Sequence, residues 1–191
     1  DTDRTLAAVD SVVLVIDGVK GGEEQTRRLM EVCRMRDTPV IVFINKLDRD
    51  GQNPFDLLDD IEKDLRISLH PLSWPINSGK DFKGVYSLYD KSLLLFHPNQ
   101  KANETDSVQI DNLNDPKLNT IIGEKDADQL REDAELIDGV YGRFDNAPYL
   151  KGQKAPVFFG SAINNFGVKE LLDTFIRISP TPQSRDTTER R

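Results

Sequence analysis

An amide, an ammonium and a carboxylate follow an apolar run in the first quarter of the chain. The run is Val40–Ile44, and the polar side chains are those of Asn45, Lys46 and Asp48, with Leu47 as the spacer. A carboxylate accepts from two neighbouring N–H donors at once, an amide donates to a ring nitrogen, and the methylenes of a lysine cover a flat ring. These groups at this spacing are suited to reading a nucleobase.

Guanine is the base that these groups match. It offers donors at N1 and N2 and acceptors at O6 and N7. Asp48 would accept from both donors, Asn45 would reach N7, and a backbone N–H beside a small residue would reach O6. Adenine would present a lone pair to the carboxylate, a loss of roughly 1–3 kcal/mol for a buried group. The small residues Gly160, Ser161 and Ala162 follow a later apolar run and offer such an N–H.

A polar turn at a strand end, with Lys46 in solvent, is the structural alternative. A pattern of three fixed residues can occur by chance in a chain of this length. The buried strand before the motif, the helix after it and the small residues at the end of another strand together favour base recognition.

Three apolar runs are expected to position these groups. They are Ser11–Asp17, Val40–Asn45 and Pro156–Ala162, each rich in Val, Ile or Phe without alternation, which is typical of parallel strands covered on both faces. In an open parallel sheet, ligands bind at the carboxyl ends of the strands. Asn45 and Ser161 lie at two such ends, and the predicted fold class is α/β.

Helices are predicted around these strands. Residues 21–38 carry acidic residues at their start and stop before Pro39, with Leu29, Cys33 and Arg36 along one side. Asn53 is placed to cap a second helix that has Pro54 in its first turn. A third helix is indicated by a stripe of Val168, Leu171, Leu172 and Phe175.

The middle of the chain differs in character and is predicted to be an inserted α+β subdomain over residues 67–154. Aromatic and β-branched residues mixed with Pro and Gly over about Ile67–Leu95 favour short antiparallel strands. Residues 97–116 are polar and are expected to form a mobile excursion. A helix is then indicated by Ala127, Leu130, Ala134, Ile137 and Tyr141.

The remaining residues form the predicted partial nucleotide-binding domain, which comprises residues 1–66 and 155–178. Residues 179–191 are polar without periodicity and are interpreted as a linker to a next domain. The chain starts at Asp1 rather than at a methionine, so we expect a fragment or a processed chain.

Composition limits the compartment and the partners. The 191 residues are 37% hydrophobic and carry a formal charge of −8, which provides for a core and argues against a direct nucleic-acid site. The one cysteine, Cys33, is expected in the core, and its isolation favours a reducing, cytoplasmic location. No apolar run reaches membrane-spanning length. His70 and His97 lack a partner at metal-ligand spacing, so both are expected at the surface or at an interface.

Beyond these features, the sequence resembles the translational GTPases, most closely the bacterial peptide chain release factor three family. Residues 1–50 carry most of the likeness. It continues in WPINSGKDFKGVYSLYDK at 74–91 and in PVFFGSAINNFGVKELLDTF at 156–175, and so covers nearly the whole chain. Elongation factor G shares the position of the insert and a similar FKG segment.

The resemblance implies guanine-nucleotide binding by Asn45, Lys46, Leu47, Asp48, Ser161 and Ala162. It implies GTP or GDP as the ligand. For the intact protein it implies magnesium, GTP hydrolysis, and release and recycling of codon-reading release factors on the ribosome. An elongation factor G-like or ribosome-protection GTPase, or a non-catalytic interaction module, are the alternatives.

One motif of the family is absent from the sequence. No Gly-x4-Gly-Lys-Ser/Thr loop occurs, so these residues include nothing that would cradle the β- and γ-phosphates. We therefore expect the C-terminal half of a P-loop GTPase domain with its insert. It would contain no catalytic or metal-binding residue and would be inactive alone.

Overall fold

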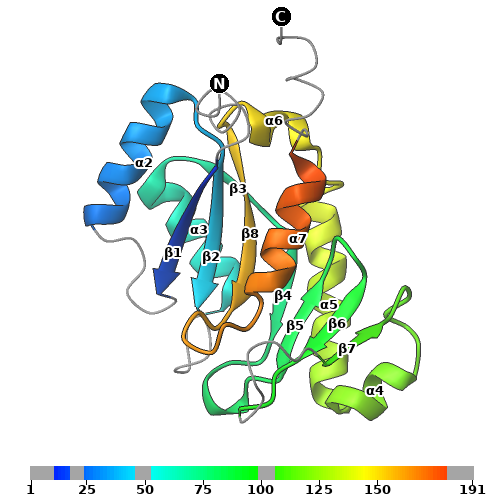
Figure 1. Cartoon of the computed structure of the whole chain (residues 1–191). Helices are drawn as coiled ribbons and strands as arrows, with labels where there is room; N and C mark the ends of the chain where they lie inside the picture. Colours follow the sequence, from blue (N-terminus) through cyan, green and yellow to red (C-terminus); the bar gives the residue numbers. More distant parts are fainter. Residues whose placement is uncertain (1–10, 18–23, 46–52, 99–105, 180–191) are drawn as a thin grey trace, which may run out of the picture.

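The computed structural model describes residues 11–17, 24–45, 53–98 and 106–179. These residues form two four-stranded sheets (Figure 1). The parallel sheet has the order β1 (Val12–Asp17), β2 (Val40–Asn45), β8 (Lys154–Gly160), β3 (Ser68–Pro71). The antiparallel sheet has the order β4 (Ser73–Ile76), β5 (Gly84–Ser87), β6 (Ser92–Leu95), β7 (Asp106–Gln109).

The described helices are distributed between the two sheets. Those beside the parallel sheet are α2 (Glu24–Arg36), α3 (Pro54–Leu65), α6 (Asn146–Leu150) and α7 (Val168–Ile178). Those of the middle segment are the short 3-10 helix η1 (Gly79–Asp81), α4 (Lys117–Ile122) and α5 (Glu124–Tyr141). None of the described helices combines the length and apolar character needed to span a bilayer.

Strand β2 forms the centre of a core that lies on both faces of the parallel sheet. Its residues Val40, Val42 and Ile44 belong to one buried cluster with α2 and α3, whereas Ile41 and Phe43 belong to a second cluster with α6 and α7. Alternate side chains of a strand point to opposite faces, and Figure 1 shows α3 and α7 on opposite sides of the sheet. The predicted α/β class, a parallel sheet flanked by helices with an antiparallel segment inserted, is confirmed.

Strand β1 differs from its prediction, because only one of its faces is covered. Leu14 and Ile16 are buried in the cluster with α2, but Val13 and Val15 are 41% and 58% exposed. The strand lies at the edge of the described sheet with β2 as its neighbour. The unbroken run of apolar residues predicted a strand buried on both faces. An edge strand that is covered on one face can contain the same run, so the sequence does not distinguish the two cases.

Strand β3 also differs from the expected antiparallel pairing of its segment. It pairs with β8 in parallel, with His70 opposite Pro156. A single residue, Leu72, joins it to β4. The Leu72 N–H donates to Val157 O of the parallel sheet, and its carbonyl accepts from the N–H of Leu88, the residue directly after β5 of the antiparallel sheet, both at 2.9 Å. One extended segment therefore belongs to both sheets.

The junction between the sheets is tightly packed around Trp74. This side chain is fully buried, lies 4.6 Å from the Phe55 ring and 5.6 Å from the Phe159 ring, and donates from Nε1 to Asp133 of α5 at 2.9 Å. Ser73 Oγ accepts from the backbone N–H of Phe159 at 2.9 Å. Residues of α3, β8 and α5 thus meet at one point.

Two further expectations about the middle segment are corrected. Residues 97–116 contain an ordered strand, β7, whose Val108 pairs with Leu93 of β6. His70 is buried rather than exposed, beneath the rings of Tyr141 and Phe144. The domain ranges proposed from the sequence stay a prediction.

Candidate functional site at the carboxyl end of the parallel sheet

The register of the parallel sheet brings the ends of three strands together. Asp17 at the end of β1 lies opposite Asn45 at the end of β2, and Asn45 lies opposite Gly160 at the end of β8. Neighbouring strands are about 4.8 Å apart, so Asn45 is adjacent to the segment that begins at Ser161. The sequence placed Asn45 and the residues from Gly160 onward at one edge, and the structure does bring Asn45 and Gly160 together.

The side chain of Asn45 has an unsatisfied acceptor. Its Oδ1 is buried and makes no hydrogen bond in the described part of the chain. A buried acceptor without a donor costs roughly 1–3 kcal/mol. The arrangement therefore fits a site whose hydrogen bonds are completed by a group outside the described residues. If Nδ2 donates to a base, Oδ1 still requires a separate donor.

The segment after β8 is folded back onto the strand. Ser161 N–H donates to Phe166 O at 3.0 Å, and Phe166 N–H donates to Ser161 O at 2.9 Å. The Ser161 N–H is therefore already used. Ala162 is exposed, and its N–H makes no hydrogen bond with the described residues. Of these two residues, it is Ala162 that has an amide available for a ligand at this edge.

Two glycines permit this fold-back. A Cβ on Gly160 would lie 2.3 Å from Phe166 O and 2.8 Å from Phe43 Cζ, closer than atoms can approach. Gly167 has a φ of +87°, and a Cβ there would lie 2.9 Å from Phe159 O. The loop can lie against the strand end only because neither residue has a side chain.

Two asparagines shape the loop, and they were not singled out from the sequence. Asn164 Nδ2 donates to Ser161 Oγ at 2.9 Å. Asn165 has a left-handed φ of 55°, and its N–H donates to Ala162 O at 3.1 Å. Asparagine tolerates this conformation better than most residues. The string Asn-Asn-Phe-Gly is the signal from which a turn here could have been predicted.

Lys46, Leu47 and Asp48 lie outside the described residues. Their assignment to the guanine base stays a prediction.

Comparison with known proteins agrees with this architecture. Residues 1–181 match the sequence model of the elongation factor Tu GTP binding domain. In fold, the chain is similar to a crystal structure of a protein from Thermus thermophilus, with a TM-score of 0.63 at 19% identity. The alignment covers 94% of this chain but 28% of that one. The family match extends over most of the sequence, and the chain belongs to the elongation factor Tu GTP-binding domain family of translational GTP-binding proteins.

Proposed function

We propose that this chain is the guanine-reading part of a GTPase that acts on the ribosome. The observation that carries the proposal is the register that sets Asn45 beside Gly160. Together with the available Ala162 N–H, it gives one edge of the sheet two donors, the Asn45 amide and this backbone N–H, that a guanine base could use.

Each group has a separate role in this proposal. The Asp48 carboxylate accepts from guanine N1 and N2, the Asn45 amide donates to N7, and the Ala162 N–H donates to O6. The methylenes of Lys46 cover one face of the ring, and Leu47 packs inward. Ser161 holds the loop through its paired backbone hydrogen bonds and its hydroxyl. These contacts discriminate bases and do not break a bond.

Hydrolysis requires groups that this sequence does not contain. Phosphoryl transfer depends on positioned phosphates and on magnesium, and the Gly-x4-Gly-Lys-Ser/Thr loop is not in these residues. In the proposal, magnesium and GTP hydrolysis belong to the intact protein. We expect the 191-residue chain to bind GTP weakly and not to hydrolyse it. Micromolar or tighter GTP binding by this chain in calorimetry would contradict the proposal that tight binding requires the phosphate-binding loop of the intact protein.

At a finer level, we propose that the intact protein recycles codon-reading release factors in translation termination, in the cytoplasm. The support is the likeness of residues 74–91 and of the helix end at RMRDTP to the release factor three family. An elongation factor G-like role is the runner-up. Release of a codon-reading factor from terminated ribosomes, dependent on the intact protein and GTP, would separate the two.

The base-reading proposal is tested by Asp48→Asn in a chain extended upstream by a phosphate-binding loop. The new amide would face the guanine N2 amino group, donor against donor, so GTP affinity should fall. Xanthine has a carbonyl oxygen at that position and can accept from the amide. Sites built on hydrogen bonds discriminate by about 10⁴ between matched and mismatched partners. The preference between GTP and XTP should therefore invert.

Asp50→Asn is the matched control, because it makes the same chemical change two residues further on. Competitive binding of GTP and XTP is measured for the parent and both variants. Inversion in Asp48→Asn alone supports the role of Asp48. Equal loss of both nucleotides would indicate a misfolded turn, and an unchanged GTP affinity would mean that Asp48 does not read the base.

A further inference from the structure

The loop between β8 and α7, residues 161–167, contains one aromatic side chain, that of Phe166. The loop lies at the carboxyl end of the parallel sheet (Figure 1) and carries the Ala162 N–H proposed to read guanine O6. At its tip, Ala162 and Ile163 are exposed. Phe166 is partly buried against the larger core cluster, and its backbone makes both hydrogen bonds to Ser161. The position of Phe166 therefore fixes that of the residue next to Ala162.

Both ring contacts of Phe166 in the described part of the chain are with the middle segment. The Phe166 ring meets Phe96 edge-on at 5.2 Å and Phe82 edge-on at 5.9 Å between ring centroids. Phe82 and Phe96 lie 5.5 Å apart, so each ring contacts the other two. Edge-to-face pairs at roughly 4.5–7 Å are an arrangement that aromatic rings prefer. We call Phe82, Phe96 and Phe166 the phenylalanine triad.

The backbone holds the two rings of the middle segment in place. Phe96 N–H donates at 2.9 Å to the carbonyl of Lys83, the residue after Phe82. The ammonium of Lys83 pairs with Asp126 of α5 at 2.5 Å. Gly84 follows, and a Cβ there would collide with a backbone carbonyl of β6. Phe82 and Phe96 therefore belong to a closely packed part of the middle segment.

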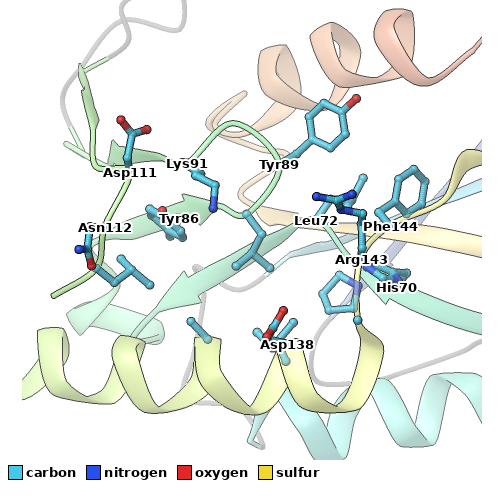
Figure 2. Close-up of a pocket in the computed structure, with 16 residues that line it drawn as sticks. His70, Leu72, Tyr86, Tyr89, Lys91, Asp111, Asn112, Asp138, Arg143 and Phe144 are labelled. Atoms are coloured by element: carbon cyan, nitrogen blue, oxygen red, sulfur yellow. The ribbon is translucent and has the colours of Figure 1, made fainter.

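Another edge-on aromatic contact of this segment involves none of the triad. Phe144 lines a cavity of about 860 Å³ beside α5 (Figure 2), and the triad is not among the described residues that line it. The Phe144 ring meets His70 at 5.2 Å, the distance that also separates Phe96 from Phe166. Phe144 and Phe96 are both partly exposed. Phe144 therefore provides a matched control for Phe96.

We propose that Phe82 and Phe96 of the middle segment are positioning residues for guanine binding. They hold the Phe166 ring, and Phe166 holds Ser161 through their paired backbone hydrogen bonds at 2.9 and 3.0 Å. Ser161 in turn sets the direction of the next N–H, that of Ala162. The two phenylalanines act through the loop and not on the base. The inference rests on the proposed function, because it requires that the Ala162 N–H reads guanine O6.

Loss of a ring from the triad should affect one base contact and leave the others. Phe166 could then shift, and the Ala162 N–H would no longer point at O6. A hydrogen bond weakens steeply when it is bent. The Asn45 amide comes from β2, whose strand pairing does not involve the triad, so the contact with N7 should remain. The discrimination at position 6 of the base is therefore the property to measure.

The test compares GDP with 6-thio-GDP, in which sulfur, a weak acceptor, replaces O6. The chain is extended upstream by a phosphate-binding loop, as in the Asp48 experiment, and binding of both nucleotides and of ADP is measured by calorimetry. One hydrogen bond changes affinity by up to about tenfold, so the parent should prefer GDP to 6-thio-GDP by up to about this factor. Phe96→Leu and Phe82→Leu should each lose most of this preference. Phe144→Leu should retain it, as should Phe96→Tyr, which keeps the ring.

The ratio of the two affinities separates positioning from destabilisation, because loss of folded protein weakens both nucleotides equally. A second measurement needs no nucleotide. Hydrogen exchange of the Ser161 N–H, which donates to Phe166 O, should be faster in Phe96→Leu than in the parent, with the amides of β2 unchanged. Phe82 is 6% exposed, and if circular dichroism shows that Phe82→Leu is unfolded, the partly exposed Phe96 decides.

The outcomes separate this inference from the proposed function. A parent that does not distinguish GDP from ADP overturns the proposed function and this inference with it. A parent that prefers GDP to ADP but not to 6-thio-GDP overturns the inference alone, because the triad then has no O6 contact to position. An unchanged preference in Phe96→Leu also overturns the inference alone. So does an equal loss in Phe144→Leu, since the effect would then not depend on the triad.

Discussion

Acidification should destabilise this protein through His70. The imidazole is 4% exposed, and burial, with a smaller contribution from the ammonium of Lys154, lowers its pKa to about 4. In the unfolded chain its pKa is about 6.5. The folded state therefore binds fewer protons than the unfolded state between these two values. Stability from this group is complete above pH 6.5 and is lost as the pH falls toward 4.

The size of the effect follows from the two pKa values. Between about pH 7.5 and pH 5.5 the unfolded histidine becomes largely protonated while the folded one stays neutral. The linkage relation gives a loss of about 1 kcal/mol in the free energy of unfolding over this interval. Few carboxylates titrate above about pH 5.5, since their usual pKa values are near 4. The interval therefore excludes most carboxylates, and because burial raises the pKa of Glu170, the histidine is identified by a variant at His70 itself.

Urea denaturation at pH 7.5, 6.5 and 5.5 measures the effect. His70→Phe keeps a ring against Tyr141 and Phe144 but cannot accept a proton, so its stability should hardly change with pH. His97→Gln is the matched control. His97 is exposed and pairs with Asp106 at 2.8 Å, and the slope that this variant retains is the one to compare with that of His70→Phe.

Two results would refute this reasoning. The first is a parent and a His70→Phe variant that lose the same stability between pH 7.5 and 5.5. The second is an NMR titration in which the His70 ring protonates near pH 6.5 in the folded chain. Either would mean that the imidazole is solvated and that its packing beneath the two aromatic rings is looser than the structure shows.

Further predictions concern the strand ends and the junction of the sheets. Gly160→Ala should destabilise the fold by about 2 kcal/mol or more, because the added carbon would lie 2.3 Å from the backbone oxygen of Phe166. Gly139→Ala is the control and should not destabilise the fold, because a Cβ there has no neighbour within 4 Å; the urea midpoints of the two variants are compared. Trp74→Phe removes the hydrogen bond to Asp133 and part of a buried ring, and should lower the free energy of unfolding by about 2 kcal/mol in the same assay. An unchanged urea midpoint would contradict the packing around Trp74. The exposed edge strand β1 should cause self-association in sedimentation velocity, and Val15→Lys should reduce it; a parent chain that stays monomeric at all concentrations would argue against an open edge.

Capping residues and prolines predicted the start of a helix well where the sequence contains them. Asn53 does cap α3, with its side chain accepting from Phe55 N–H, and Pro54 begins the helix. Apolar spacing was a less accurate guide to which face of a helix is buried. In α2 it is Met30 and Cys33 that are buried, whereas Leu29 is 42% exposed. A helix face identified from apolar spacing alone can be wrong by one residue, because the sheet decides which side is covered.

Long-range pairing could not be predicted from the sequence. The segment Ser68–Ile76 contains β3 and β4 with only Leu72 between them, and the Pro71 and Ser73 that flank it do not reveal that the chain changes sheet there. Its parallel partner, β8, begins at Lys154, more than 80 residues later. At the candidate site, the strand ends were predictable, but the fold-back that uses the Ser161 N–H was not. Its hydrogen bonds depend on Phe166 being brought to within reach by two glycines.

The order of strands in the parallel sheet has a consequence for how the chain is made. β8 lies between β2 and β3, yet it is the last of the four to be synthesised. As the nascent chain leaves the ribosome, β2 and β3 therefore emerge without the strand that joins them. Their unpaired edges stay open until some 80 further residues have followed, and synthesis at about 5–20 residues per second makes this a wait of several seconds. During that wait, premature pairing of β2 with β3 would exclude β8, so a chaperone that covers these edges should raise the yield of correctly folded chain.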